Sequence, residues 1–153
     1  MKLTKTTKIV LIALVLLTVA AAGLYLTTRR QIPENTLAVE YGSTTYYCDL
    51  QGLRLTGIAG ERVNGKGEVK PVKGMGVSMH GLLAWTLGPD YTAAQVTVTA
   101  DDGFSAVVTG EEILEENKVV LLLQEDSTKL QLIVFGDADS KRSVKNVESL
   151  LVE

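Results

Sequence analysis

A continuous apolar stretch lies near the N-terminus of the chain, and short segments of alternating apolar and polar residues follow it. The stretch covers residues 9–26 and is interrupted only by Thr18 and Gly23. At about 1.5 Å per residue, it is just long enough to cross a bilayer core of roughly 30 Å as a helix. The pattern predicts a membrane anchor or signal peptide (1–28), a polar linker (29–35) and one domain (36–153).

Basic residues flank this stretch unequally. Three lysines precede it and two arginines follow it, at positions 2, 5, 8, 29 and 30. This asymmetry predicts a single-pass membrane protein with a cytoplasmic N-terminus and its domain outside. The small residues 20–23 also fit a signal-peptidase site, so secretion after cleavage is the alternative. Apolar residues continue to position 26, which favours retention of the segment.

Residues 36–153 show mainly the two-residue period of strands. Strands are predicted over residues 36–41, 44–48, 53–63, 66–72, 95–100, 104–108, 119–123, 129–135 and 144–152. Two short helices are predicted at 79–87, after Ser78 as N-cap, and at 111–116, where Thr109 and Glu112 match a capping box.

Two glycine-containing sequences are expected to shape the strand-rich region. Asn64-Gly65 predicts a two-residue hairpin turn, and Gly74-Met75-Gly76 is expected to break the strand pattern. The predicted fold class is therefore α+β, with a mixed or antiparallel strand-rich domain, two short helices and one preceding transmembrane helix.

Charge and cysteine content exclude several function classes. Without the three leading lysines, 12 of the 15 basic residues remain against 18 acidic residues, a net charge of −6. Nucleic acids and anionic membrane surfaces are poor partners for such a domain. The single cysteine permits no internal disulfide, and one cysteine with one histidine argues against an ordinary zinc site.

Four short signatures in the second half of the chain carry a resemblance. They are GVSMHGLL (76–83), VTADDGFSAVV (98–108), KLQLIVFG (129–136) and KRSVKNVESLLV (141–152). In this order and spacing they resemble the oxidoreductase molybdopterin-binding domain, which has the sulfite oxidase fold. The resemblance covers about half of the chain, and it implies that fold and a molybdopterin cofactor.

The resemblance also implies candidate ligands for that cofactor. In the family, a stretch similar to KRSVKN contacts the pterin phosphate, which implies Arg142, Ser143 and Lys145 as phosphate ligands. The alternative is a solvated face of an edge strand, and Asn146 replaces the tryptophan of the family. Active members bind molybdenum through one thiolate, for which Cys48 is the only candidate. Its surroundings, YYCDLQG, differ from the family's, and the alternative is a small buried residue.

A loop of the enzymatic relatives is missing from this chain. Their His-Gly-x-Pro-x-Arg loop lines the pterin pocket, whereas QEDSTK (124–129) leads directly into the next strand. A pyranopterin needs many polar contacts in a deep cleft. We therefore expect no cofactor, no catalytic residue and no independent redox activity.

The function predicted from the sequence is that of a binding module in a bacterial envelope. Its expected partners are the membrane, through the N-terminal helix, and an envelope protein or small ligand. The alternative is a genuine molybdenum-cofactor-binding oxidoreductase domain or subunit. A purely structural envelope module that shares only the sheet topology is a third possibility.

Overall fold

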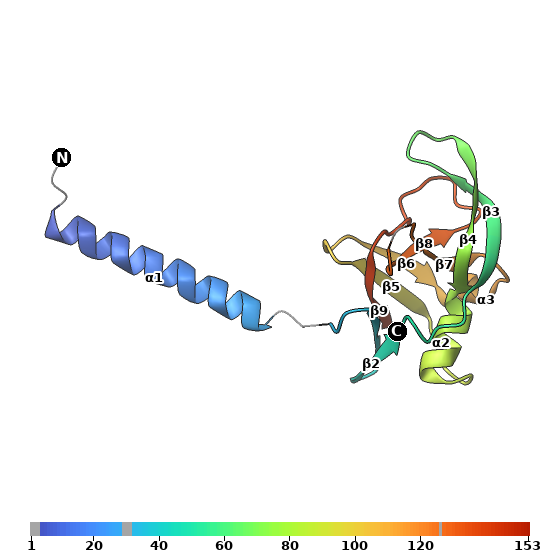
Figure 1. Ribbon diagram of the computed structural model, residues 1–153, viewed down its shortest axis with the longest axis horizontal. Helices are drawn as coiled ribbons and strands as arrows, with labels where there is room; N and C mark the ends of the chain where they lie inside the picture. The colour runs from blue at the N-terminus through green and yellow to red at the C-terminus, as the bar shows by residue number, and fades with distance from the viewer. Residues whose placement is uncertain (1–3, 29–31, 126) are drawn as a thin grey trace. The chain divides into compact units, whose positions relative to one another are not determined.

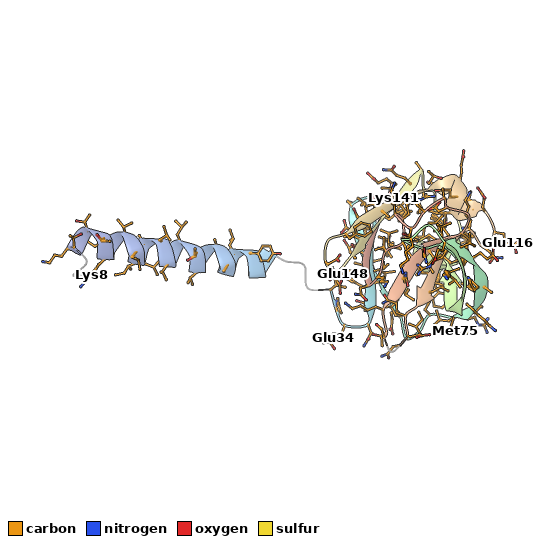
Figure 2. The ribbon with its side chains drawn as sticks, turned by 90° about the horizontal axis from the view of Figure 1, so that it is seen from above. Lys8, Glu34, Met75, Glu116, Lys141 and Glu148 are labelled. Carbon is orange, nitrogen blue, oxygen red and sulfur yellow. The ribbon has the colours of Figure 1, made fainter. Side chains whose placement is uncertain are left out.

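The structure is a computed structural model that describes residues 4–28, 32–125 and 127–153, in two compact units, Met1–Gln31 and Ile32–Glu153. In its described residues, 4–28, the first unit forms helix α1 (Lys5–Thr28), and the side chains of residues 4–25 are exposed (Figure 2). Over Lys5–Tyr25 its mean hydropathy is 2.3 and no residue is buried. The predicted apolar helix is confirmed, and its length suits either a membrane anchor or a signal sequence. The orientation stays a prediction.

The second unit contains two β-sheets (Figure 1). The first sheet has the strand order β2 (Thr44–Asp49), β1 (Thr36–Tyr41), β9 (Val147–Val152), β5 (Gln95–Ala100) and β6 (Ser105–Thr109). The second has the order β3 (Thr56–Val63), β4 (Val69–Ser78), β7 (Val119–Leu123) and β8 (Leu130–Val134). Strands β1 and β9 are parallel, whereas the other paired strands are antiparallel. The α+β class with mixed and antiparallel sheets is thus confirmed.

Both predicted short helices form, α2 with its predicted bounds and α3 one residue earlier at its start and two residues earlier at its end. In α2 (Met79–Leu87), the backbone N–H of Gly81 donates to the Ser78 hydroxyl at 3.0 Å. In α3 (Gly110–Leu114), Thr109 and Glu112 form the complete reciprocal capping box. Each cap satisfies backbone N–H groups that a helix start leaves without partners.

The main core lies between the two sheets and α2. Three residues of α2, Met79, Leu82 and Leu83, are fully buried against it. The inward residues of β5 alternate as the sequence predicts, because Val96 and Val98 are buried in the same cluster. A smaller cluster joins the β3–β4 hairpin (56–78) to the opposite faces of β7 and β8; its buried members are Ile58, Val120, Leu122 and Ile133.

The β3–β4 hairpin differs from the sequence prediction in two respects. β4 continues through Gly74 and Gly76 to Ser78, so the expected break is wrong. A Cβ on Gly76 would collide with the carbonyl oxygen of Leu121, so this glycine permits a close approach inside the strand. The two-residue turn is also wrong, because the Asn64 N–H donates to the carbonyl of Glu68 and the positive φ, 78°, is at Gly67.

Candidate functional site

Three chain connections enclose a cleft of about 450 Å³ at one end of the second unit. They are the tip of the β3–β4 hairpin, the β5–β6 turn and the connection between β8 and β9 (Figure 1). Arg62, Ser143 and Lys145 bring polar donors to the lining, while Asp102 and the half-exposed ring of Phe104 come from the β5–β6 turn. The cleft therefore combines a cationic part with one carboxylate and one apolar surface.

The hydroxyl of Ser143 is fixed by two donors. Arg62 Nη1 donates to its Oγ at 3.1 Å, and Gln131 Nε2 donates to it at 2.9 Å. A hydroxyl oxygen accepts two hydrogen bonds and donates one. Both lone pairs are thus used, and the O–H proton is left to donate to a group in the cleft.

Arg62 reaches Ser143 from a strand 81 positions earlier in the chain. Its Nε is buried without a hydrogen-bond partner among the described residues. None of the ion pairs in the described part of the chain involves Arg62. A partly buried guanidinium with an unsatisfied N–H and no carboxylate partner favours the binding of an anion beside it.

The backbone groups of the residues on either side of Lys145 are fixed by hydrogen bonds. The carbonyl of Val144 accepts from the N–H of Leu132 at 2.8 Å. The N–H of Asn146 donates to Oε1 of Gln124 at 2.7 Å, and Asn146 has a left-handed φ of 51°. These bonds fix the segment from which the exposed Lys145 lines the cleft.

Arg142 does not line this cleft, and its guanidinium is bound by two carboxylates and one backbone carbonyl. Nη1 and Nη2 donate to the two oxygens of Glu112 at 2.8 Å each. Nε and Nη2 donate to Asp137, the former at 2.9 Å, and Nη1 also donates to the carbonyl of Val107 at 3.4 Å. All five N–H donors of the side chain are therefore used, which leaves none for a phosphate in this arrangement.

This ion-pair network shifts the pKa values of its members. The hydrogen bonds from Arg142 are the largest cause that lowers the pKa of Glu112 from 4.5 to about 2. The same bonds to Glu112, followed by those to Asp137, raise the pKa of Arg142 above its ordinary value. The network therefore joins the first turn of α3 to the connection after β8 as a permanently charged structural link.

Cys48 lies in the main core rather than in the cleft. Its side chain is buried in β2, and it belongs to the same cluster as the residues of α2. Burial raises the pKa of the Cys48 thiol, and a hydrogen bond with Thr86 opposes this only in part. Among the described residues, no group of three or more His, Cys, Asp or Glu side chains could hold a metal ion. This environment disfavours the thiolate that a metal requires.

Of the residues implied by the resemblance, Ser143 and Lys145 line the cleft, whereas Arg142 and Cys48 are not part of its lining. Sequence reasoning missed Arg62 and Gln131, whose relation to Ser143 depends on tertiary contacts across the second sheet. In comparisons with known proteins, no protein-family model matches this chain, and no curated protein matches it. The resemblance to the molybdopterin domain and its sulfite oxidase-type fold therefore stays a prediction.

Proposed function

We propose that this protein is a membrane-anchored, extracytoplasmic binding module without redox activity, and that its cleft holds a small organic anion. The observation that carries the proposal is the pair formed by Arg62 and Ser143. The Ser143 hydroxyl has a proton to donate, and the buried Nε–H of Arg62 has no partner within residues 4–28, 32–125 and 127–153. Together with the ammonium of Lys145, these groups suit a phosphate or carboxylate group.

The charge of the cleft supports an anionic ligand despite the acidic composition of the chain. Five of the 15 basic residues precede residue 32, so residues 32–153 carry 10 basic against 18 acidic side chains. In the cleft this balance is reversed, because its lining contains two basic residues, Arg62 and Lys145, and one acidic residue, Asp102. The negative field of the domain weakens the binding of every anion, so the contacts of Arg62 and Lys145 with the ligand must supply the attraction.

The size of the cleft supports a ligand larger than an inorganic ion. Pockets for organic ligands usually enclose roughly 300–1,000 Å³, and this cleft of about 450 Å³ lies within that range. The ring of Phe104, 49% exposed, offers an apolar surface for the non-anionic part of the ligand. We therefore expect an aromatic or apolar group attached to the anion.

A titration of the full chain in detergent micelles tests this function. Phenyl phosphate should bind more tightly than inorganic phosphate in isothermal titration calorimetry, and neutral benzyl alcohol should not bind. Lys145→Ala and Ser143→Ala should each weaken binding by roughly 1–3 kcal/mol, the usual scale for a hydrogen bond to a charged group. Benzoate in place of phenyl phosphate separates a carboxylate from a phosphate site.

The matched control is Lys141→Ala, a neighbouring exposed lysine that pairs with Asp139 at 3.2 Å and does not line the cleft. It should leave the affinity unchanged. Equal losses in the Lys141 and Lys145 variants would show a diffuse charge effect and refute the assigned site.

A molybdenum-cofactor oxidoreductase is the alternative function, and KRSVKN is the observation that favours it. It would use Cys48 as the metal ligand and Arg142, Ser143 and Lys145 for the phosphate. The fit is poor, because Cys48 is buried in the core and Arg142 is bound by two carboxylates. The lining of the cleft contains Ser143 and Lys145 but neither of the other two.

A further inference from the structure

The β3–β4 hairpin has a charge opposite to that of the rest of the domain. The hairpin (56–78) carries four of the 10 basic residues of segment 32–153, but only two of its 18 acidic residues. Among the described residues, Lys73 forms no ion pair, and it is exposed. The hairpin is therefore a basic arm on an acidic domain.

The hairpin also ends the second sheet with a free strand edge. In the described part of the chain, β3 pairs only with β4, along all eight of its residues. On its other side, β4 pairs with β7 only at residues 76–78. The rest of that edge of β4 contains Pro71, which has no backbone N–H and therefore disfavours strand addition there. β3 contains no proline, so its outer edge offers an uninterrupted series of backbone donors and acceptors.

A hollow of about 490 Å³ lies on the hairpin and includes residues of this free strand. Gly57, Ile58 and Ala59 of β3 line it together with Lys73, Gly74 and Met75 of β4. Met75 is half-exposed and lies at the margin of the domain in Figure 2. The hollow is thus largely apolar, with one lysine in its lining.

The glycines of the hairpin fall into two groups. Gly60 and Gly76 are required by packing, because a Cβ on Gly60 would be 2.6 Å from the Phe135 ring and one on Gly76 would collide with the Leu121 carbonyl. Gly57 and Gly74 have nothing within 4 Å of an added Cβ, and neither has a positive φ. Neither packing nor backbone conformation explains them, whereas close approach of another backbone does.

We propose that the free edge of β3 and the adjacent hollow dock an extended, acidic segment of a partner protein. The segment adds a strand beside β3 and places an apolar side chain next to Gly57, on the face that Gly57 shares with its paired residue Met75. It directs a carboxylate toward Lys73, which lies on the same face. Strand addition of this kind takes its affinity from main-chain hydrogen bonds and its selectivity from side-chain pockets. The hollow shares no lining residue with the anion-binding cleft, and this proposal does not depend on the proposed function of that cleft.

Two other occupants fit the observations less well. A second copy of β3 would bring two basic hairpins side by side, and like charges disfavour that pairing. An anionic lipid surface would attract the lysines but would leave the backbone groups of the edge without ordered partners. Both occupants are outcomes that the experiment distinguishes.

The test uses the full chain in nanodiscs of neutral phosphatidylcholine. The probes are fluorescein-labelled seven-residue peptides of alternating valine and glutamate, alternating valine and lysine, and a glutamate peptide with a central proline. Fluorescence anisotropy should show binding of the glutamate peptide only. Gly57→Val, whose Cβ would meet nothing within 4 Å, should weaken the binding of the glutamate peptide roughly tenfold or more. Lys73→Glu should reverse the preference between glutamate and lysine peptides.

The matched control is Thr44→Val on β2, the exposed edge strand of the other sheet, which should leave the affinity unchanged. Thermal unfolding of the Gly57 variant checks that it stays folded. Equal binding of the glutamate and lysine peptides, or equal loss in the Gly57 and Thr44 variants, would overturn the proposal. So would self-association that Gly57→Val abolishes, or binding only to phosphatidylglycerol vesicles.

Discussion

Arg142 and Glu112 form a bidentate ion pair in which Nη1 and Nη2 donate to the two carboxylate oxygens at 2.8 Å each. The two residues are 30 positions apart, and the same Glu112 side chain also completes the capping box of α3 by accepting from the N–H of Thr109. The pair therefore attaches a short helix to a long connection, and it defines Arg142 as a structural residue.

The first prediction concerns the stability that this pair provides. Arg142→Ala should lower the free energy of unfolding by about 2–4 kcal/mol, because it leaves Glu112 and Asp137, 17% and 18% exposed, without their shared cation. Urea unfolding of the full chain in detergent measures this loss. Lys145→Ala, which removes an exposed lysine that forms no ion pair with the described residues, should change it by less than about 0.5 kcal/mol. Equal effects of the two substitutions would contradict the structural role.

The second prediction is a loss of stability at acidic pH. The folded state lowers the pKa of Glu112 from 4.5 to about 2, chiefly through its hydrogen bonds with Arg142. Such a shift stabilises the fold fully above about pH 4.5, and the contribution is lost as pH falls toward 2. At about 1.4 kcal/mol per pKa unit, the loss is about 3 kcal/mol. Urea unfolding between pH 2 and pH 7 should show it, and Glu112→Gln should flatten that part of the profile.

Local patterns predicted most of the secondary structure, because their physical causes lie within a few residues. Strand β5 matches its predicted bounds through strict alternation, and the capping box of Thr109 and Glu112 is confirmed. The break expected at Gly74–Gly76 is wrong, since Gly76 lies within β4 and lets it approach Leu121 of the neighbouring strand β7 closely. Pattern reasoning treats a glycine as a local signal, whereas the cause here is tertiary.

The candidate site was predictable only in part. Ser143 and Lys145 were indicated by a motif, and both line the cleft. No sequence motif indicated Arg62 as a site residue, because it contacts Ser143, 81 positions away, only in the folded chain. The role of Arg142 depends on Glu112 and Asp137, and no short motif records which carboxylates a folded chain places around a guanidinium.

The third prediction compares two glycines of the same strand. Gly76→Ala should destabilise the protein by roughly 1–3 kcal/mol, because the added Cβ would collide with the Leu121 carbonyl. Gly74→Ala should be neutral or stabilise by up to about 1 kcal/mol, since its Cβ would meet nothing within 4 Å. Thermal unfolding of both variants under one condition measures the difference. A similar effect at both positions would contradict the packing of β4 against β7.

The fourth prediction concerns the N-terminal helix. The apolar helix α1 and the three lysines that precede its apolar stretch lead us to expect that the full chain stays with bacterial membranes through a carbonate wash. Protease added from the periplasmic side should digest residues 32–153. A soluble mature protein that begins near Gly23 would instead establish the segment as a cleaved signal peptide.

The last prediction separates the two proposed functions through Cys48. Its thiol is 4% exposed, and burial raises its pKa, so it should react slowly with a disulfide reagent until the protein unfolds. Natively purified protein should contain molybdenum far below one atom per chain and show no pterin absorbance. Cys48→Ser should cost about 1–2 kcal/mol of stability, because it replaces a small buried packing group with a polar one. It should not change the affinity for phenyl phosphate, since Cys48 lies outside the lining of the cleft. Stoichiometric molybdenum that Cys48→Ser removes would instead identify the protein as a cofactor-dependent oxidoreductase, because this chain has no other thiolate to offer.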